Sequence, residues 1–106
     1  MTSHAPTRLD LDAVKARIAS VGDGLRALGV TKVTVFGSVA RGDAGPGSDV
    51  DVMIATREPV LPARNYFQIE DLLSAAVGAP VGLVTETGTD GRLRTEVARD
   101  GVETRF

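Results

Sequence analysis

The chain has 106 residues, enough for one domain with a single hydrophobic core. Hydrophobic residues make up 42% and charged residues 25%, as is typical of a globular protein rather than a disordered one. The net charge of −2, with no basic run, argues against direct nucleic-acid binding, and the absence of cysteine excludes disulfide bonds and sulfur-based zinc sites.

The amino end is polar and lacks the apolar core of a signal peptide. No apolar run in the chain approaches the roughly 20 residues of a membrane helix. We therefore predict a cytoplasmic protein that does not contact a membrane. We expect a flexible amino terminus over residues 1–9, which contains the only histidine, His4, and one domain over residues 10–106. Without a histidine or cysteine site, catalysis would depend on carboxylates, hydroxyls, cations and backbone groups.

The first predicted element is a helix over residues 11–28, because its apolar residues recur at steps of three or four. Asp10 is a candidate cap at its start, and Gly29 lies where a helix commonly ends. Two glycines weaken the middle, so we expect a possible break near Gly22. The β-branched and apolar residues 32–36 then predict a short strand.

A glycine-rich loop precedes a second predicted strand at residues 49–55. Residues 63–77 have the apolar spacing of a helix, and residues 81–85 predict a third strand. A short helix over residues 90–100 and a final edge strand over residues 102–106 complete the chain. This order predicts an α+β fold, a small mixed β-sheet flanked by helices.

Two acids mark the second predicted strand. Asp49 and Asp51 are two positions apart, so both side chains would leave the same face of the strand. Their α-carbons would lie roughly 6.5 Å apart at about 3.3 Å rise per residue. Two carboxylates this close repel each other unless a cation neutralises them. Oxygen ligands without His or Cys favour Mg²⁺ or Mn²⁺.

A glycine-serine pair ends the first predicted strand. Gly37 would let a phosphate approach the backbone, and the Ser38 hydroxyl could donate to a phosphate oxygen. If a helix starts there, its free N–H groups would add to an anion site. Arg41, one turn further on, could face the same pocket. A phosphate-binding turn opposite two metal ligands suits nucleotidyl transfer, in which a metal neutralises the triphosphate.

These residues resemble a known signature. Gly37-Ser38, followed after ten residues by Asp49-Val50-Asp51, is similar to the motif of the minimal nucleotidyltransferases in the DNA polymerase beta superfamily. Phe36, Arg41 and Ser48 agree with it, and the resemblance covers roughly residues 10–106. It implies a nucleotidyltransferase-like fold.

The resemblance also implies roles for these residues. Asp49 and Asp51 would be catalytic and would bind Mg²⁺, and Gly37, Ser38, Arg41 and Ser48 would bind the nucleotide. Many members of this family are antitoxins of HEPN-type RNase toxins, and the best understood transfer AMP from ATP to a tyrosine of the toxin. By this analogy we expect ATP as substrate and a HEPN-type toxin as partner.

One position departs from the family pattern. The family usually has a third carboxylate on a later strand, and the matching place here is Gly82. Glu86 is the nearest acid along that strand but would lie roughly 13 Å away, and Asp43 lies on a loop. Two hypotheses therefore stand: a metal-dependent nucleotidyltransferase antitoxin, or a degenerate domain that neutralises a partner by binding alone.

Overall fold

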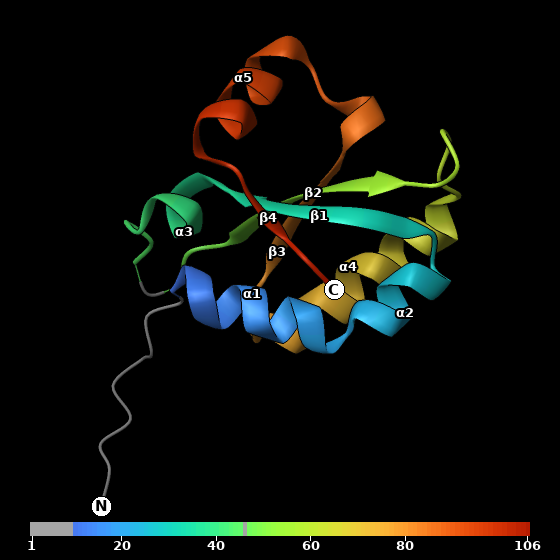
Figure 1. The fold of residues 1–106 in the computed structure, drawn as a ribbon, viewed down its shortest axis with the longest axis horizontal. Coiled ribbons are helices and arrows are strands. Elements are labelled where there is room, and N and C mark those ends of the chain that lie inside the picture. Colours follow the sequence, from blue (N-terminus) through green and yellow to red (C-terminus); the bar gives the residue numbers. More distant parts are fainter. Residues whose placement is uncertain (1–9, 46) are drawn as a thin grey trace, which may run out of the picture.

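The structure is a computed structural model that describes residues 10–45 and 47–106. The predicted flexible amino terminus, with His4, lies outside this part. Four strands form one mixed sheet in the order β3-β2-β1-β4 (Figure 1). Strand β1 is antiparallel to both β2 and β4, and β2 is parallel to β3. The strands are β1 (Val30–Phe36), β2 (Val50–Thr56), β3 (Val81–Thr85) and β4 (Val102–Thr104).

The helices cover the two faces of this sheet unequally. Three of them, α1, α2 and α4, lie on one side, α5 lies on the other, and α3 lies at one end (Figure 1). A short 3-10 helix, η1, follows β3. The bounds are α1 (Leu11–Ser20), α2 (Gly22–Ala27), α3 (Gly37–Arg41), α4 (Ala63–Val77), η1 (Glu86–Gly88) and α5 (Gly91–Asp100).

The hydrophobic core lies between the sheet and the three-helix layer. Along β2, Val50, Val52 and Ile54 are buried and belong to this core, together with residues of α1 and α4 such as Ile18 and Leu73. Because side chains alternate along a strand, the residues between them on β2 face α5 instead. The sheet therefore has one closed apolar face and one partly open face, and Asp51 of the predicted acidic pair lies on the open one.

The predicted α+β sheet flanked by helices is confirmed. The helix expected over residues 63–77 and the strand expected over residues 81–85 have the predicted bounds, as α4 and β3. The first predicted helix is divided at Val21, one residue before the expected break. The ring of Phe106 packs against Gly22 there, and any side chain at Gly22 would overlap it. Asp10 caps α1 as predicted, accepting a hydrogen bond from the backbone N–H of Ala13 at 2.8 Å.

Within the described residues, no helix is both long and apolar enough to cross a membrane. The longest is α4, with 15 residues. A spanning helix needs about 20.

The core predicts a clear difference in stability between two variants. Leu73 of α4 is fully buried, so Leu73→Ala should lower the free energy of unfolding by about 2–5 kcal/mol. Val60, in the β2–α4 connection, is 79% exposed, so Val60→Ala should change it by no more than about 0.5 kcal/mol. Urea denaturation of the two variants beside wild type measures both values. Equal losses would contradict the packing described here.

Candidate functional site

The predicted phosphate turn lies where β1 passes directly into α3. Gly37 is the first residue of that five-residue helix and has φ of 73°, a left-handed value that favours glycine. Its α-carbon also lies against Asp51, since a β-carbon on Gly37 would overlap the carboxylate of Asp51. Ser38 follows, half-buried. The glycine therefore allows the turn to touch the acidic strand.

The two aspartates occupy the start of β2. Asp49 is exposed and immediately precedes the strand, and Asp51 is half-buried within it. Asp51 pairs with Phe36 in the antiparallel β1–β2 ladder, which brings it beside the Gly37 turn. The structure thus brings Gly37, the first residue of the predicted phosphate turn, against the metal-ligand candidate Asp51.

Gly82 lies directly beside Asp51. The parallel β2–β3 ladder pairs these two residues, and a β-carbon on Gly82 would lie 3.0 Å from Oδ1 of Asp51. A carboxylate at this position would face the same site as Asp51. The strand therefore lacks a third acid at a place where one could act.

The two residues considered as replacements for that acid are each paired with a basic side chain. Glu86 begins η1, and its carboxylate forms an ion pair with Lys32 at 3.3 Å. Glu86 and Lys32 line a different hollow of the open sheet face, of about 300 Å³, which does not include Asp51. Asp43 pairs with Arg41 at 3.2 Å.

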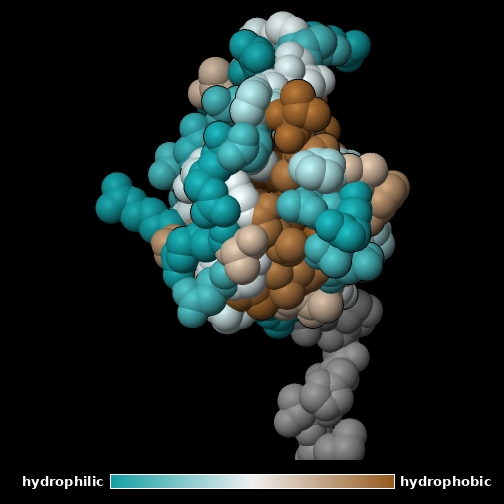
Figure 2. Space-filling model, turned by 90° about the vertical axis from the view of Figure 1, so that its right-hand side faces the viewer, coloured by the Kyte–Doolittle hydropathy of each residue, from teal (hydrophilic) through white to brown (hydrophobic). Residues whose placement is uncertain are grey.

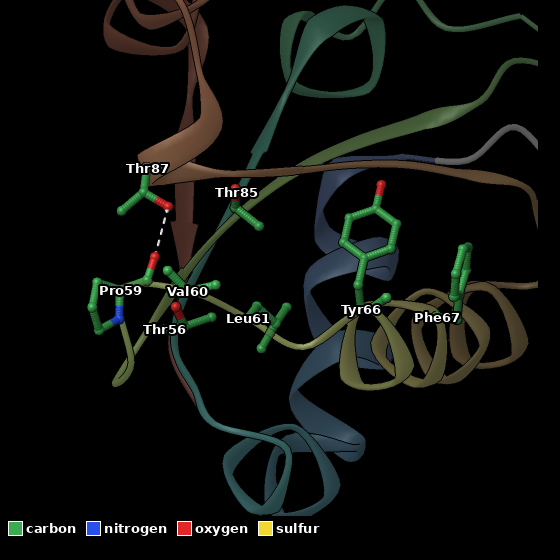
Figure 3. A pocket seen from close by; sticks show the side chains of 9 residues that line it. Thr56, Pro59, Val60, Leu61, Tyr66, Phe67, Thr85 and Thr87 are labelled. Carbon is green, nitrogen blue, oxygen red and sulfur yellow. Dashed lines mark hydrogen bonds between the residues drawn. The ribbon is translucent and has the colours of Figure 1, made fainter.

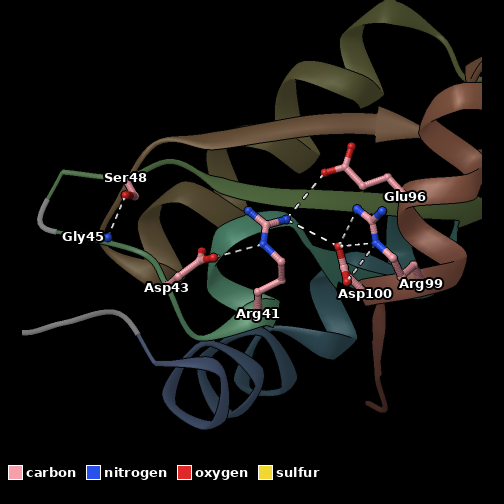
Figure 4. Close-up of polar contacts among 7 residues, drawn as sticks. All are labelled: Arg41, Asp43, Gly45, Ser48, Glu96, Arg99 and Asp100. Atoms are coloured by element: carbon pink, nitrogen blue, oxygen red, sulfur yellow. Dashed lines mark hydrogen bonds and ion pairs between the residues drawn. The ribbon is translucent and has the colours of Figure 1, made fainter.

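Arg41 is surrounded by acids rather than presented as a free cation. Its guanidinium contacts Asp43 at 3.2 Å, Asp100 at 3.4 Å and Glu96 at 3.8 Å (Figure 4). The hydrogen bond from Arg41 to Asp43 raises the pKa of the guanidinium further, and Asp100 adds to this. Arg41 therefore links α3 to α5. A role in nucleotide binding, predicted from the sequence, stays a prediction.

Ser48 closes its own loop. Its hydroxyl accepts a hydrogen bond from the backbone N–H of Gly45 at 3.1 Å (Figure 4). Its backbone N–H in turn donates to the carbonyl of Gly45 at 3.2 Å. The residue thus shapes the approach to Asp49. Its predicted contact with a nucleotide stays a prediction.

Asp51 carries an electrostatic cost in the folded state. Burial raises the pKa of its carboxyl above the ordinary value, and the negative charges of Glu96 and Asp49 raise it further, whereas Arg41 opposes them. A carboxylate in such a place is one that a bound cation would stabilise.

This cost predicts a gain of stability on neutralising Asp51. Because its folded pKa is raised, the free energy of unfolding falls as pH rises from the ordinary aspartate pKa of about 3.9 through the raised value. In buffer with a chelator, Asp51→Asn should therefore raise Tm at pH 7, with a gain that shrinks toward pH 4. Asp49→Asn, which removes one of the repelling charges from an exposed position, should give a smaller gain. A Tm difference for Asp51→Asn independent of pH would contradict this account.

These residues fit a divalent metal only with help from a substrate. Among residues 10–45 and 47–106, no group of three or more His, Cys, Asp or Glu side chains could hold a metal ion. Asp49 and Asp51 offer two hard oxygen ligands on one strand, one of them disfavoured as a bare anion. Mg²⁺ commonly binds through one or two carboxylates, with substrate phosphates and water completing its shell. The pair therefore fits a metal that arrives with a nucleotide.

A cavity of about 460 Å³ lies beside Asp51 on the open face of the sheet. Gly82 and Phe36 line it from the strands, Glu70 from α4 and Glu96 from α5. Glu96 was not predicted as a site residue, because only the packing of α5 over the sheet brings it near Asp51. The helical spacing of the inward-facing residues Leu93 and Val97 could have indicated Glu96, because Glu96 directly precedes Val97 on the same turn.

A second hollow, of about 390 Å³, lies apart from the predicted site residues. Its walls are the β2–α4 connection, the start of α4 and the end of β3 (Figure 3). Phe67 and Val60 line it and are 59% and 79% exposed, and Thr87 donates a hydrogen bond to the carbonyl of Pro59 at 3.3 Å across it. The side of the molecule that carries this connection shows a hydrophobic band between hydrophilic residues (Figure 2).

The chain is similar to known proteins over most of its length. Residues 19–102 match the family model for the nucleotidyltransferase domain. Over 74 residues, which are 70% of this chain and 74% of the relative, the sequence is 32% identical to the protein adenylyltransferase MntA of Thermococcus cleftensis. The fold is also similar to a solved structure assigned as a minimal nucleotidyltransferase, with a TM-score of 0.75, 34% identity, and coverage of 95% of this chain and 98% of that one.

A more distant likeness concerns the fold alone. The chain superposes with a TM-score of 0.65 and 17% identity on a chain in the structure of a tri-AMPylated HEPN toxin from Shewanella oneidensis in complex with an MNT antitoxin. The alignment covers 87% of this chain and 71% of that one.

With the family match over most of its length and the contact between the Gly37 turn and Asp51, this chain belongs to the nucleotidyltransferase domain family.

Proposed function

We propose that this protein is a Mg²⁺-dependent nucleotidyltransferase that transfers AMP from ATP to a HEPN-type toxin, and that it acts as the antitoxin of that pair in the cytoplasm. The observation that carries the proposal is the contact between the Gly37-Ser38 turn and Asp51 on the adjacent strand. The likeness to an adenylyltransferase named MntA supports AMP as the transferred group. The fold shared with a toxin complex supports the partner.

In this proposal each residue has one task. Asp49 and Asp51 hold the metal, which neutralises charge on the triphosphate when bound. The glycine at position 37 leaves room for a phosphate at the backbone, and the Ser38 hydroxyl donates a hydrogen bond to a phosphate oxygen. Arg41 holds α5 beside the site through Glu96 and Asp100 and adds positive charge near the phosphates. Ser48 keeps the loop before Asp49 in place.

Transfer to the partner tests this function directly. The purified chain is incubated with Mg²⁺, ATP labelled at the α-phosphate and a purified HEPN-type toxin. Label on a tyrosine of the partner, with a mass increase of one AMP, is the expected result. The same reaction with label at the γ-phosphate is the control, since that label should leave with pyrophosphate. Transfer of the γ-label would indicate a kinase instead.

Gly82 supports a second candidate function. Because β3 supplies no acid beside Asp51, the domain could bind a nucleotide and neutralise its partner by contact alone. This candidate predicts that Asp49→Asn still neutralises the toxin in a growth assay. The enzyme predicts that Asp49→Asn fails to do so although the variant is folded and still binds the partner.

A further inference from the structure

An acid on α5 lies where the chemistry of transfer needs a base. An acceptor hydroxyl is a weak nucleophile until its proton is removed, and a positioned carboxylate can remove it. Asp49 and Asp51 are poorly suited to this task if they hold a metal, because their lone pairs are then engaged. Gly82, the neighbour of Asp51 on β3, has no side chain to offer.

Two further acids line the cavity beside Asp51, and the structure separates them. Glu96 comes from α5, above the open face of the sheet, and Glu70 comes from α4 at the β3 side. Glu96 forms an ion pair with Arg41 of α3, the helix that begins at the Gly37 turn, whereas Glu70 lies on α4. Glu96 is thus the acid of the cavity that is linked to the predicted phosphate turn.

An ion pair with Arg41 holds the side chain of Glu96 in position. Its Oε1 lies 3.8 Å from Nη1 of Arg41, which in turn contacts Asp100 at 3.4 Å (Figure 4). The side chain of Glu96 lines the cavity and is 37% exposed, so solvent can reach it. A proton taken up there can leave to water.

We infer that Glu96 is the general base of the transfer reaction, the role that no residue of β3 can fill. This inference rests on the proposed function. The acceptor hydroxyl oxygen forms a bond to the α-phosphorus of ATP while the bond from that phosphorus to the leaving oxygen breaks. Pyrophosphate leaves with the electron pair, and the hydroxyl proton passes to the carboxylate of Glu96. Glu96 then returns the proton to solvent.

The test compares Glu96→Gln with wild type in two measurements. The substitution keeps the size of the side chain and removes only its basic oxygen, and Gln suits a helix as well as Glu. The rate of AMP transfer should fall by about 10²–10⁴-fold. The Kd for Mg²⁺ with an α,β-methylene ATP analogue, which cannot release pyrophosphate, should stay within a factor of about three by calorimetry.

Two control variants separate this role from others. Glu70→Gln changes the other acid of the cavity and should leave the transfer rate within about threefold of wild type. Asp100→Asn removes a contact of Arg41 without changing the cavity lining, so it shows whether loosening Arg41 alone slows transfer.

Each outcome of these measurements either supports or overturns the inference about Glu96. Slow transfer with intact binding in Glu96→Gln alone supports the inference. Full activity of Glu96→Gln, an equal loss in Glu70→Gln or Asp100→Asn, or a large loss of nucleotide binding in Glu96→Gln would overturn it while leaving the proposed function standing. Absence of transfer by wild type itself would overturn both.

Discussion

Replacing Asp49 and Asp51 together by asparagine should abolish metal-dependent nucleotide binding. Asp51 lies within β2 and lines the cavity on the open sheet face, and Asp49 immediately precedes the strand. Among the described residues, no group of three or more His, Cys, Asp or Glu side chains could hold a metal in their place. Asparagine keeps their size but removes both negative charges. We expect the affinity for Mg²⁺-ATP to fall by at least about 100-fold, or about 2.8 kcal/mol, and transfer to become undetectable.

Calorimetric titration of Mg²⁺-ATP into wild type and the double variant measures this effect. Glu86→Gln is the matched control, because Glu86 is an acid of the same sheet face that pairs with Lys32 away from the cavity at Asp51. It should bind like wild type. Chelating the metal should reproduce the loss in wild type and leave the double variant unchanged. No binding of any NTP by wild type at millimolar concentrations would instead favour a domain that acts by contact alone.

Local patterns in the sequence predicted the elements well. Helix α4 and strand β3 have the expected bounds, because the apolar period changes clearly from helix to strand at Gly78 and Pro80. The alternation of side chains along a strand predicted that Asp49 and Asp51 leave one face, and Asp51 lies on the face opposite the core. These features depend on residues near one another in the chain, which a sequence displays directly.

Features that depend on tertiary packing could not be predicted from the sequence. The register that pairs Asp51 with Phe36 and Gly82 is fixed by three strands together. The sequence analysis considered Glu86 and Asp43 as substitutes for the missing acid, since both are close along the chain. Glu96 enters the cavity only because α5 folds back over the sheet, and the same packing engages Arg41 with acids on α5. Spacing predicted the metal pair, whereas contacts between distant segments were needed for the rest of the site.

The contact between Gly37 and Asp51 allows a test in which strain and site geometry are separated. Gly37 begins helix α3 and Gly42 follows its last residue, and both have positive φ, of 73° and 82°. Alanine at either position should lower the free energy of unfolding by about 1–2 kcal/mol, because a β-carbon disfavours the left-handed conformation. Only at Gly37 would the new methyl group overlap the carboxylate of Asp51, whereas no atom lies within 4 Å of the corresponding position at Gly42.

Gly37→Ala should therefore displace Asp51 and close the backbone to a phosphate, in addition to straining the turn. A displacement of about 1 Å in a catalytic group can cost about 100-fold in rate, so we expect at least that loss of AMP transfer. Gly42→Ala should have a Tm similar to that of Gly37→Ala. Its transfer rate should stay within about threefold of wild type, because its methyl group meets open space. Transfer rates and thermal unfolding of the two variants, measured side by side, distinguish the two effects. If both variants lost activity in proportion to their stability, strain alone would explain the glycine, and the turn would not be the phosphate site proposed here.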